Sequence, residues 1–175
     1  MRNMKGQAAM EYLMTYGWAL VALVIIIAAL MATGVFNPSY MVSEECSFQP
    51  DLSCGSYVLY NQGDQTFLKF RVDNGLGYDI KIVNTNADIV VKTQGSNAVD
   101  WDLTEVSPAL IEQGKNATVT LRYTGAHPPL KGDLMRMTVQ LTYLSCAPEV
   151  NPDCAENTPT HTISGRIVAR AEEKT

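Results

Sequence analysis

Two patterns of apolar residues divide the chain. Residues 12–43 contain no Asp, Glu, Lys or Arg, and residues 13–35 are apolar apart from a few small or weakly polar positions. At about 1.5 Å per residue, a helix of this length is long enough to cross a hydrocarbon layer of about 30 Å. From residue 44 onward, apolar residues instead alternate with polar ones, a pattern typical of half-buried strands.

The apolar segment predicts one helix over residues 7–36. No proline interrupts it before Pro38, and the residue before a proline is pushed out of the helical region. Small residues such as Gly17, Ala28 and Ala32 would let neighbouring helices approach closely, although an alanine-rich span does not need a partner. We expect residues 37–43 to form a linker.

Alternation predicts the strands of the second part of the chain. The clearest runs are residues 68–72, 80–82, 118–123, 135–143 and 163–169. Turn signals separate them at residues 61–64, 74–77 and 125–129. We therefore expect an α+β chain in which the helix is followed, over residues 44–171, by an all-β Ig-like antiparallel sandwich of about seven or eight strands. A barrel-like closure is the alternative, and residues 172–175 are expected to be a tail.

Charge is unevenly distributed along the chain. Arg2 and Lys5 precede the apolar segment, whereas residues 36–175 carry 11 basic and 17 acidic residues. The positive-inside rule then places the amino terminus in the cytoplasm and the large domain outside. No basic or aromatic cluster in the sequence indicates nucleic-acid binding, so we expect no nucleic-acid partner.

One carboxylate, Glu11, stands at the head of the apolar segment. An unpaired charge inside a membrane costs roughly 2.5–3.5 kcal/mol on insertion scales, so an acid at this position indicates a function.

The residues around Glu11 resemble a known leader. Residues 5–13 read KGQAAMEYL, which resembles the amino-terminal signature of archaeal type IV pilins and pilin-like proteins with a class III signal peptide. Ala9 stands where the family usually has serine. The resemblance implies that a prepilin peptidase removes residues 1–6 by cutting between Gly6 and Gln7. It also implies a helical filament of identical subunits as the product, and an assembly ATPase with its membrane platform as further partners.

The chemistry of assembly follows from these residues. Cleavage would expose the α-amine of Gln7, whose reference pKa of about 8 leaves it charged at neutral pH. In a bundle of helices, Glu11 of one subunit can pair with the Gln7 amine of its neighbour, which would fix the register of the subunits. We expect a cytoplasmic-membrane precursor and then an extracellular filament for adhesion or surface attachment, without enzymatic activity.

Two other interpretations of the apolar segment were weighed. A secretory signal peptide would be cut near Thr33, but its apolar stretch should span only 7 to 15 residues. A single-pass anchor fits better, and it would carry an extracellular β-sandwich binding module that does not polymerise.

Four cysteines form two pairs with the same spacing, namely Cys46 with Cys54 and Cys146 with Cys154. In an extracellular domain they predict disulfides, and three connectivities are possible. The two local bridges are favoured because each encloses a short polar loop. A zinc site fits poorly, since paired cysteines in structural zinc sites usually have two to four residues between them.

No other motif predicts catalysis, a metal or a cofactor. His127 and His161 belong to no metal or nucleophile motif. Asp73, Asp79, Asp100 and Asp102 could offer oxygen ligands to calcium, but no loop has EF-hand spacing, and solvated surface acids explain them better. Asn116 begins the acceptor sequon Asn-Ala-Thr and is a possible N-glycosylation site.

Overall fold

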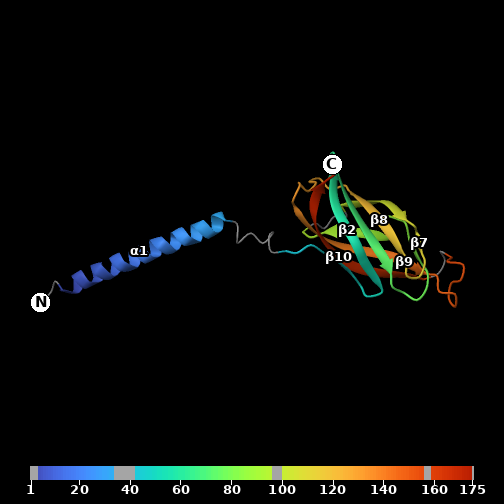
Figure 1. Cartoon of the computed structure of the whole chain (residues 1–175), viewed down its shortest axis with the longest axis horizontal. Coiled ribbons are helices and arrows are strands. Elements are labelled where there is room, and N and C mark those ends of the chain that lie inside the picture. Colours follow the sequence, from blue (N-terminus) through green and yellow to red (C-terminus); the bar gives the residue numbers. More distant parts are fainter. Residues whose placement is uncertain (1–3, 34–41, 96–99, 156–158, 175) are drawn as a thin grey trace. The chain divides into compact units, whose positions relative to one another are not determined.

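The chain forms two compact units, Met1–Ser43 and Glu44–Thr175. The computed structural model describes residues 4–33, 42–95, 100–155 and 159–174, and within the helix only the backbone is described at residues 4–9, 13 and 15. In the described residues, the first unit contains helix α1 and the second contains strands β1 to β10 (Figure 1).

Helix α1 spans Met4–Ala32. Thr33 follows the last helical residue; its backbone N–H donates to the carbonyl of Ala29 at 3.0 Å, and its hydroxyl donates to the carbonyl of Leu30 at 2.8 Å. The predicted start at Gln7 is wrong by three residues. Met and Lys are good helix formers, and the single Gly6 costs only about 1 kcal/mol, so nothing prevents an earlier start. The predicted end at residue 36 and most of the predicted linker lie outside the described residues.

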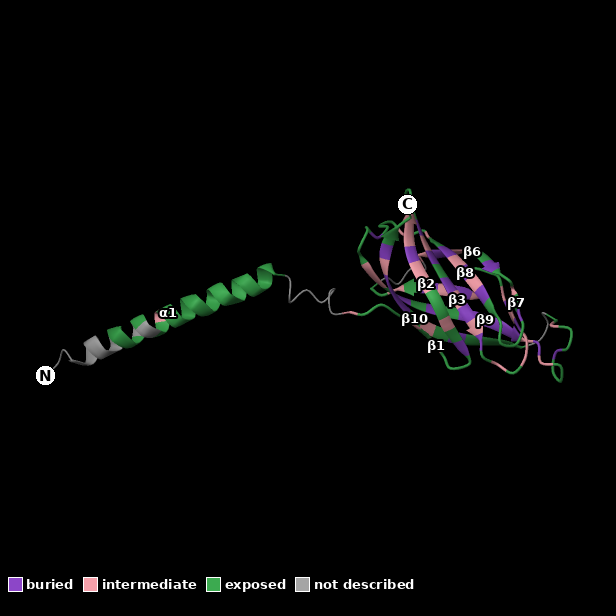
Figure 2. Ribbon diagram, viewed as in Figure 1, coloured by how far each residue is buried: buried purple, intermediate pink, exposed green. Residues whose placement is uncertain are grey.

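Apart from Glu11, the described side chains of α1 are aliphatic or aromatic, and they are exposed. Figure 2 shows the ribbon of the helix as exposed along most of its described length. Exposed fractions reach 77% at Trp18 and 71% at Met14. The 23 residues Met10–Ala32 are long and apolar enough to cross a membrane. The helix therefore has no polar face to turn toward water, and its surface requires an apolar environment.

The second unit is a sandwich of two sheets. Its strands are β1 Glu45–Phe48, β2 Leu52–Gln62, β3 Gln65–Asn74, β4 Ile80–Ile82, β5 Ile89–Thr93, β6 Trp101–Ser107, β7 Leu110–Ile111, β8 Asn116–Tyr123, β9 Leu134–Ser145 and β10 Thr160–Glu173. Sheet A contains β1, β10, β9, β4, β5 and β7, and sheet B contains β2, β3, β8 and β6. Strand β10 belongs to both sheets, because residues 160–170 pair with β9 and residues 171–173 pair with β2.

The predicted fold class, a helix followed by a β-sandwich, is confirmed, but three details differ. The sandwich has ten strands rather than seven or eight, and β10 runs parallel to β2 whereas all other pairs are antiparallel. The expected tail from residue 172 is wrong, because Glu172 and Glu173 pair with Tyr60 and Asn61 of β2. The path of paired strands runs from β6 to β7 without closing on itself in the described residues, so the barrel alternative is not realised.

Apolar positions of the predicted alternation fill the space between the sheets. The fully buried ones include Leu68, Phe70, Val72, Ile80, Val119, Leu121, Val139, Leu141 and Ile167. The largest buried side chain is Trp101 of β6, which is 2% exposed. Its indole N–H donates to the hydroxyl of Thr93 at 3.2 Å, and its ring meets Tyr123 edge-on at 5.1 Å between centroids. A buried indole thus keeps its hydrogen bond, as its polar group requires.

The three predicted turns connect strands as expected. Gly63 lies between β2 and β3 with a φ of 60°, a backbone conformation that residues other than glycine rarely adopt. The side chain of Asn74, the last residue of β3, stabilises the turn that follows. Its amide donates to the carbonyls of Tyr78 at 2.9 Å and Ile111 at 3.1 Å, and its oxygen accepts from the N–H of Leu76 at 3.0 Å. No helix follows this glycine-containing turn, because β4 begins at Ile80.

Candidate functional site

The residues predicted for processing and assembly all lie near the start of α1. Gly6 and Gln7 both have helical backbone, so the bond expected to be cut lies within the first turns of the helix. Glu11 lies about one turn beyond Gln7, and its side chain is exposed. The pair between Glu11 and the amine of a neighbouring subunit stays a prediction, because it joins two copies of the chain.

The first disulfide joins the two sheets. Cys46 lies in β1 of sheet A and Cys54 lies in β2 of sheet B, and the bridge between them spans a Cα–Cα distance of 5.8 Å. Strand β1 has four residues and, in the described part of the chain, pairs with β10 alone. The bridge therefore fixes a short edge strand to the opposite sheet. Both cysteines lie in strands, with the polar loop between them.

The second disulfide, between Cys146 and Cys154, lies in the connection from β9 to β10. Asn151 is 4% exposed and organises the same loop. Its amide donates to the carbonyls of Ser145 at 3.1 Å and Ala155 at 3.2 Å, while its oxygen accepts from the N–H of Ala155 at 2.8 Å. The loop is thus held by hydrogen bonds as well as by the bridge.

The remaining predicted residues lie apart from one another. Asn116 is exposed at the start of β8, where a glycan would point into solvent, and its N-glycosylation stays a prediction. His127 is exposed after β8, and the ring of His161 stacks on Tyr143 at 5.4 Å. Among the described residues, no group of three or more His, Cys, Asp and Glu side chains is placed to hold a metal ion.

Acids weighed as calcium ligands have structural contacts instead. The carboxylate of Asp73 forms an ion pair with Arg71, with 3.0 Å between Oδ1 and Nε, and that of Asp79 accepts a hydrogen bond from the backbone N–H of Gln113 at 2.8 Å. Asp102 pairs with Arg122 at 3.7 Å. The Asp73 contact lies within β3, the Asp102 contact joins β6 to β8, and the Asp79 contact joins the residue before β4 to a residue after β7.

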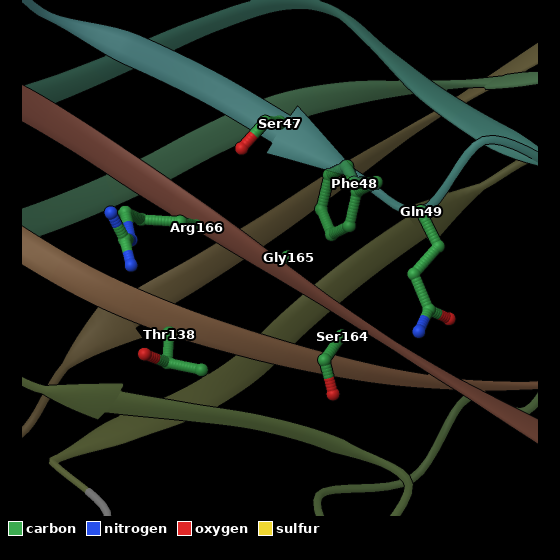
Figure 3. Close-up of a pocket in the computed structure, with 7 residues that line it drawn as sticks. All are labelled: Ser47, Phe48, Gln49, Thr138, Ser164, Gly165 and Arg166. Atoms are coloured by element: carbon green, nitrogen blue, oxygen red, sulfur yellow. The ribbon is translucent and has the colours of Figure 1, made fainter.

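A shallow groove of about 310 Å³ lies on sheet A where β1 ends. Figure 3 shows Ser47 and Phe48 on β1, followed by Gln49, beside Gly165 and Arg166 on β10. Thr138 of β9 and Ser164 of β10 complete the lining. The groove thus presents three hydroxyls, one carboxamide and one guanidinium, which suit hydrogen bonding to a polar ligand.

Strand pairing extends the groove into a row of polar side chains. Thr138 lies opposite Lys92 of β5 on one side and opposite Arg166 of β10 on the other, and Arg166 in turn lies opposite Ser47. All four side chains are exposed on the outer face of sheet A. Side chains directly opposite on paired strands have Cβ atoms about 4.5–5.5 Å apart, so these four residues are immediate neighbours. Arg136 is exposed two residues before Thr138 on β9, hence on the same face.

Two ion pairs border this row. Arg166 lies 3.7 Å from the carboxylate of Glu45, and Arg170 lies 3.6 Å from that of Glu44. The same two acids lie near Tyr57. Partial burial is the main cause that raises the pKa of the Tyr57 hydroxyl, and the negative charges of Glu44 and Glu45 raise it further. The Arg166 pair is open to water, with side-chain exposures of 69% and 48%, so it holds the guanidinium only weakly.

This row was not predicted from the sequence. Lys92, Thr138 and Arg166 lie in three separate segments, and each is an ordinary polar residue of an alternating strand. Only the pairing of β5 and β10 on either side of β9 brings them together.

No family model and no curated protein matches the chain. Among solved structures, the periplasmic chaperone SfaE is similar at a TM-score of 0.38 and 15% identity, over 71% of this chain and 57% of that one. A PapD-like domain of human CEP192 is similar at a TM-score of 0.36 and 9% identity, over 71% of this chain and 87% of that one. The archaeal flagellum of Methanospirillum hungatei strain JF1 is similar at a TM-score of 0.29 and 15% identity, over 93% of this chain and 97% of that one. All three TM-scores are below 0.5.

Proposed function

We propose that this chain is the structural subunit of an extracellular type IV pilus-like filament, used for adhesion or surface attachment. In this proposal a prepilin peptidase cuts between Gly6 and Gln7, and the trimmed subunits polymerise through α1. The resemblance of residues 5–13 to the class III signal peptide supports the cleavage.

The observation that carries the proposal is the surface of α1. Apart from Glu11, its described side chains are aliphatic or aromatic and exposed around the helix, and they belong to a unit separate from the sandwich. Such a helix is stable in a membrane or in the middle of a bundle of like helices. A filament subunit needs both environments in succession, first as a membrane precursor and then in the filament core.

Glu11 supports polymerisation over simple anchoring. A carboxylate at the head of an apolar helix is costly, and an anchor gains nothing from it. In a filament, the amine of Gln7 from the next subunit would pair with Glu11, and a subunit in the wrong register would leave a buried charge unpaired.

The proposal also assigns location and partners. The sandwich lies outside the cell, where its two disulfides are chemically stable. The partners are copies of the chain, the prepilin peptidase, and an assembly ATPase with its membrane platform. The chain itself has no catalytic role in this proposal.

A membrane-anchored binding module is the second candidate. The candidate span Met10–Ala32 and the polar groove on sheet A favour it, since an anchor and a ligand groove are all that such a module requires. It would remain monomeric in the membrane, and it would have no use for cleavage after Gly6.

Two measurements on expressing cells separate the candidates. Mass spectrometry of the mature amino terminus should find Gln7, and electron microscopy should find filaments that disappear in a Glu11→Ala variant. A Glu172→Ala variant is the matched control, because it removes one exposed carboxylate from the end of β10. An intact Met1 together with surface display that Glu11→Ala leaves unchanged would establish the anchored module instead.

A further inference from the structure

The outer face of sheet A carries a concentration of positive charge. Four neighbouring strand segments form this face, namely residues 44–48, 90–94, 136–140 and 164–170. They contain four cations, Lys92, Arg136, Arg166 and Arg170, and two carboxylates, Glu44 and Glu45. Residues 36–175 as a whole carry 17 acidic and 11 basic residues. A locally positive face on an acidic domain attracts anionic groups at short range, within the screening length of about 8–10 Å in physiological salt.

Two of these cations are not engaged by acids. Glu45 and Glu44 pair with Arg166 and Arg170, whereas no carboxylate of the described residues forms an ion pair with Lys92 or Arg136. The Arg166 pair is long at 3.7 Å and exposed to water. Exposed pairs of this kind contribute about 0–1 kcal/mol, so a ligand carboxylate can compete with Glu45 for the guanidinium.

The groove beside Arg166 supplies neutral hydrogen-bonding groups. Ser47, Thr138 and Ser164 offer hydroxyls, and Gln49 offers a carboxamide (Figure 3). The groove exists because β1 stops at Phe48, so the edge of β10 before Gly165 has no strand beside it in the described part of the sheet. A ligand at this edge is therefore offered both side-chain hydroxyls and the strand edge itself.

These groups fit a chain of sugars better than a nucleic acid. Hydroxyls and a carboxamide pair with sugar hydroxyls, and guanidinium and ammonium groups pair with the carboxylates of acidic sugars. Nucleic-acid binding instead relies on many Lys and Arg contacts to phosphates and, for single strands, on aromatic rings on which bases stack. The aromatic side chain of the groove, Phe48, points inward and packs near Phe70 at 5.7 Å between ring centroids.

We propose that the outer face of sheet A, with Lys92, Arg136 and Arg166 around the Ser47–Thr138–Ser164 groove, binds an acidic polysaccharide. Carboxylates of the sugar chain pair with the three cations, and its hydroxyls occupy the groove. The binding requires neither cleavage nor polymerisation, so it can hold or fail independently of the filament proposal.

Binding of polygalacturonate to the full chain in detergent micelles tests this assignment. Arg166→Gln and Lys92→Gln should each weaken binding roughly tenfold, which corresponds to the loss of one charge-assisted contact of about 1.4 kcal/mol. Lys69→Gln is the matched control, because it removes the same charge from β3 on the other sheet and should leave affinity unchanged. Affinity should also fall as salt is raised.

Neutral and polyphosphate probes decide the ligand class. Methyl-esterified polygalacturonate, which has the same sugar backbone without charge, should bind much more weakly than the acid form. A single-stranded oligodeoxynucleotide that binds more tightly than polygalacturonate would overturn the proposal. So would equal affinities of the Arg166→Gln and Lys69→Gln variants, provided that both unfold thermally as the wild type does.

Discussion

The ring of Phe48 in β1 lies directly against Gly165 in β10. A Cβ atom added to Gly165 would overlap the Phe48 ring and would lie 2.7 Å from the carbonyl oxygen of Ser47. The two residues are register partners in the pairing of β1 with β10. Glycine at position 165 is therefore required by the close approach of an aromatic ring rather than by its own backbone conformation.

Gly165→Ala should destabilise the sandwich by about 1–3 kcal/mol, because β1 or the Phe48 ring must shift to admit the methyl group. Guanidinium unfolding of the full chain in detergent, followed by tryptophan emission, measures this loss. The control is Gly77→Ala, where an added Cβ meets no atom within 4 Å and should change stability by less than about 0.5 kcal/mol. Equal stability of the two variants would contradict the close contact.

Substitution of Asn74 should lower the stability of the sandwich more than substitution of its other polar residues. Asn74 is 2% exposed, and besides Tyr78 and Ile111 its amide also donates to the carbonyl of Glu112 at 3.3 Å. Asn74→Ala removes the hydrogen bonds to these carbonyls and the one from the N–H of Leu76, which should cost roughly 2–4 kcal/mol. Asn74→Asp keeps the size but replaces the donor by an acceptor, so it should cost at least as much at neutral pH.

The matched control for Asn74 is Asn84→Ala, at an exposed position between β4 and β5. It should unfold at the same denaturant concentration as the wild type. If Asn74→Asp is as stable as the wild type, the hydrogen bonds assigned to its amide are not those that hold the turn.

The two disulfides should differ in what they hold. Both close loops of sequence separation 8, so each restricts the unfolded chain by the same amount, about 2.5 kcal/mol in the chain-entropy model. Removing Cys46 and Cys54 also releases β1 from sheet B, whereas Asn151 still holds the other loop. Amide exchange in β1 should therefore rise strongly in Cys46→Ala/Cys54→Ala, while residues 146–155 stay protected in Cys146→Ala/Cys154→Ala. If amide exchange rises equally in β1 of the first variant and in residues 146–155 of the second, the two disulfides do not differ in this way.

Period-two alternation predicted the longer strands that bury one face and missed the short strands β1, β5 and β7 as well as the two strands that contain bulges, β2 and β6. The runs in β3, β8, β9 and β10 were visible because each strand buries one face. Strand β2 was missed: it contains Gly55, and its register against β3 shifts between Cys54 and Ser56. Strand β6 has a similar shift between Leu103 and Glu105. A bulge moves side chains to the other face, so the alternation breaks where it occurs.

Contacts between distant segments were equally invisible in the sequence. The parallel pairing of Ala171 with Leu59 depends on how β10 passes from one sheet to the other, which no local pattern records. The same holds for the row of Lys92, Thr138 and Arg166. The helix and the cysteine pairs, in contrast, are encoded by composition and short spacing, and these were predicted from residues close together in the chain.

Alkaline pH should weaken the sandwich through its buried tyrosines. Tyr143 is 5% exposed, and burial first, with Tyr78 and Asp51 adding to it, raises the pKa of its hydroxyl. Burial, aided by Asp100, likewise raises the pKa of Tyr123. The folded state therefore holds these protons more tightly than the unfolded chain, whose tyrosine pKa is about 10. Stability is complete below about pH 10 and is lost as the pH rises toward the folded pKa values.

Tyr143→Phe tests this dependence, because phenylalanine keeps the ring that stacks on His161 and removes only the titrating hydroxyl. The variant should match the wild type closely at pH 7. Between about pH 9 and 11 its unfolding free energy should fall less steeply than that of the wild type, since each such group contributes at most about 1.4 kcal/mol per pH unit. Tyr123 and Tyr57 still titrate in the variant, so the slope should decrease without vanishing. Unfolding curves that keep the full wild-type slope would show that Tyr143 ionises as easily in the folded chain as in the unfolded one.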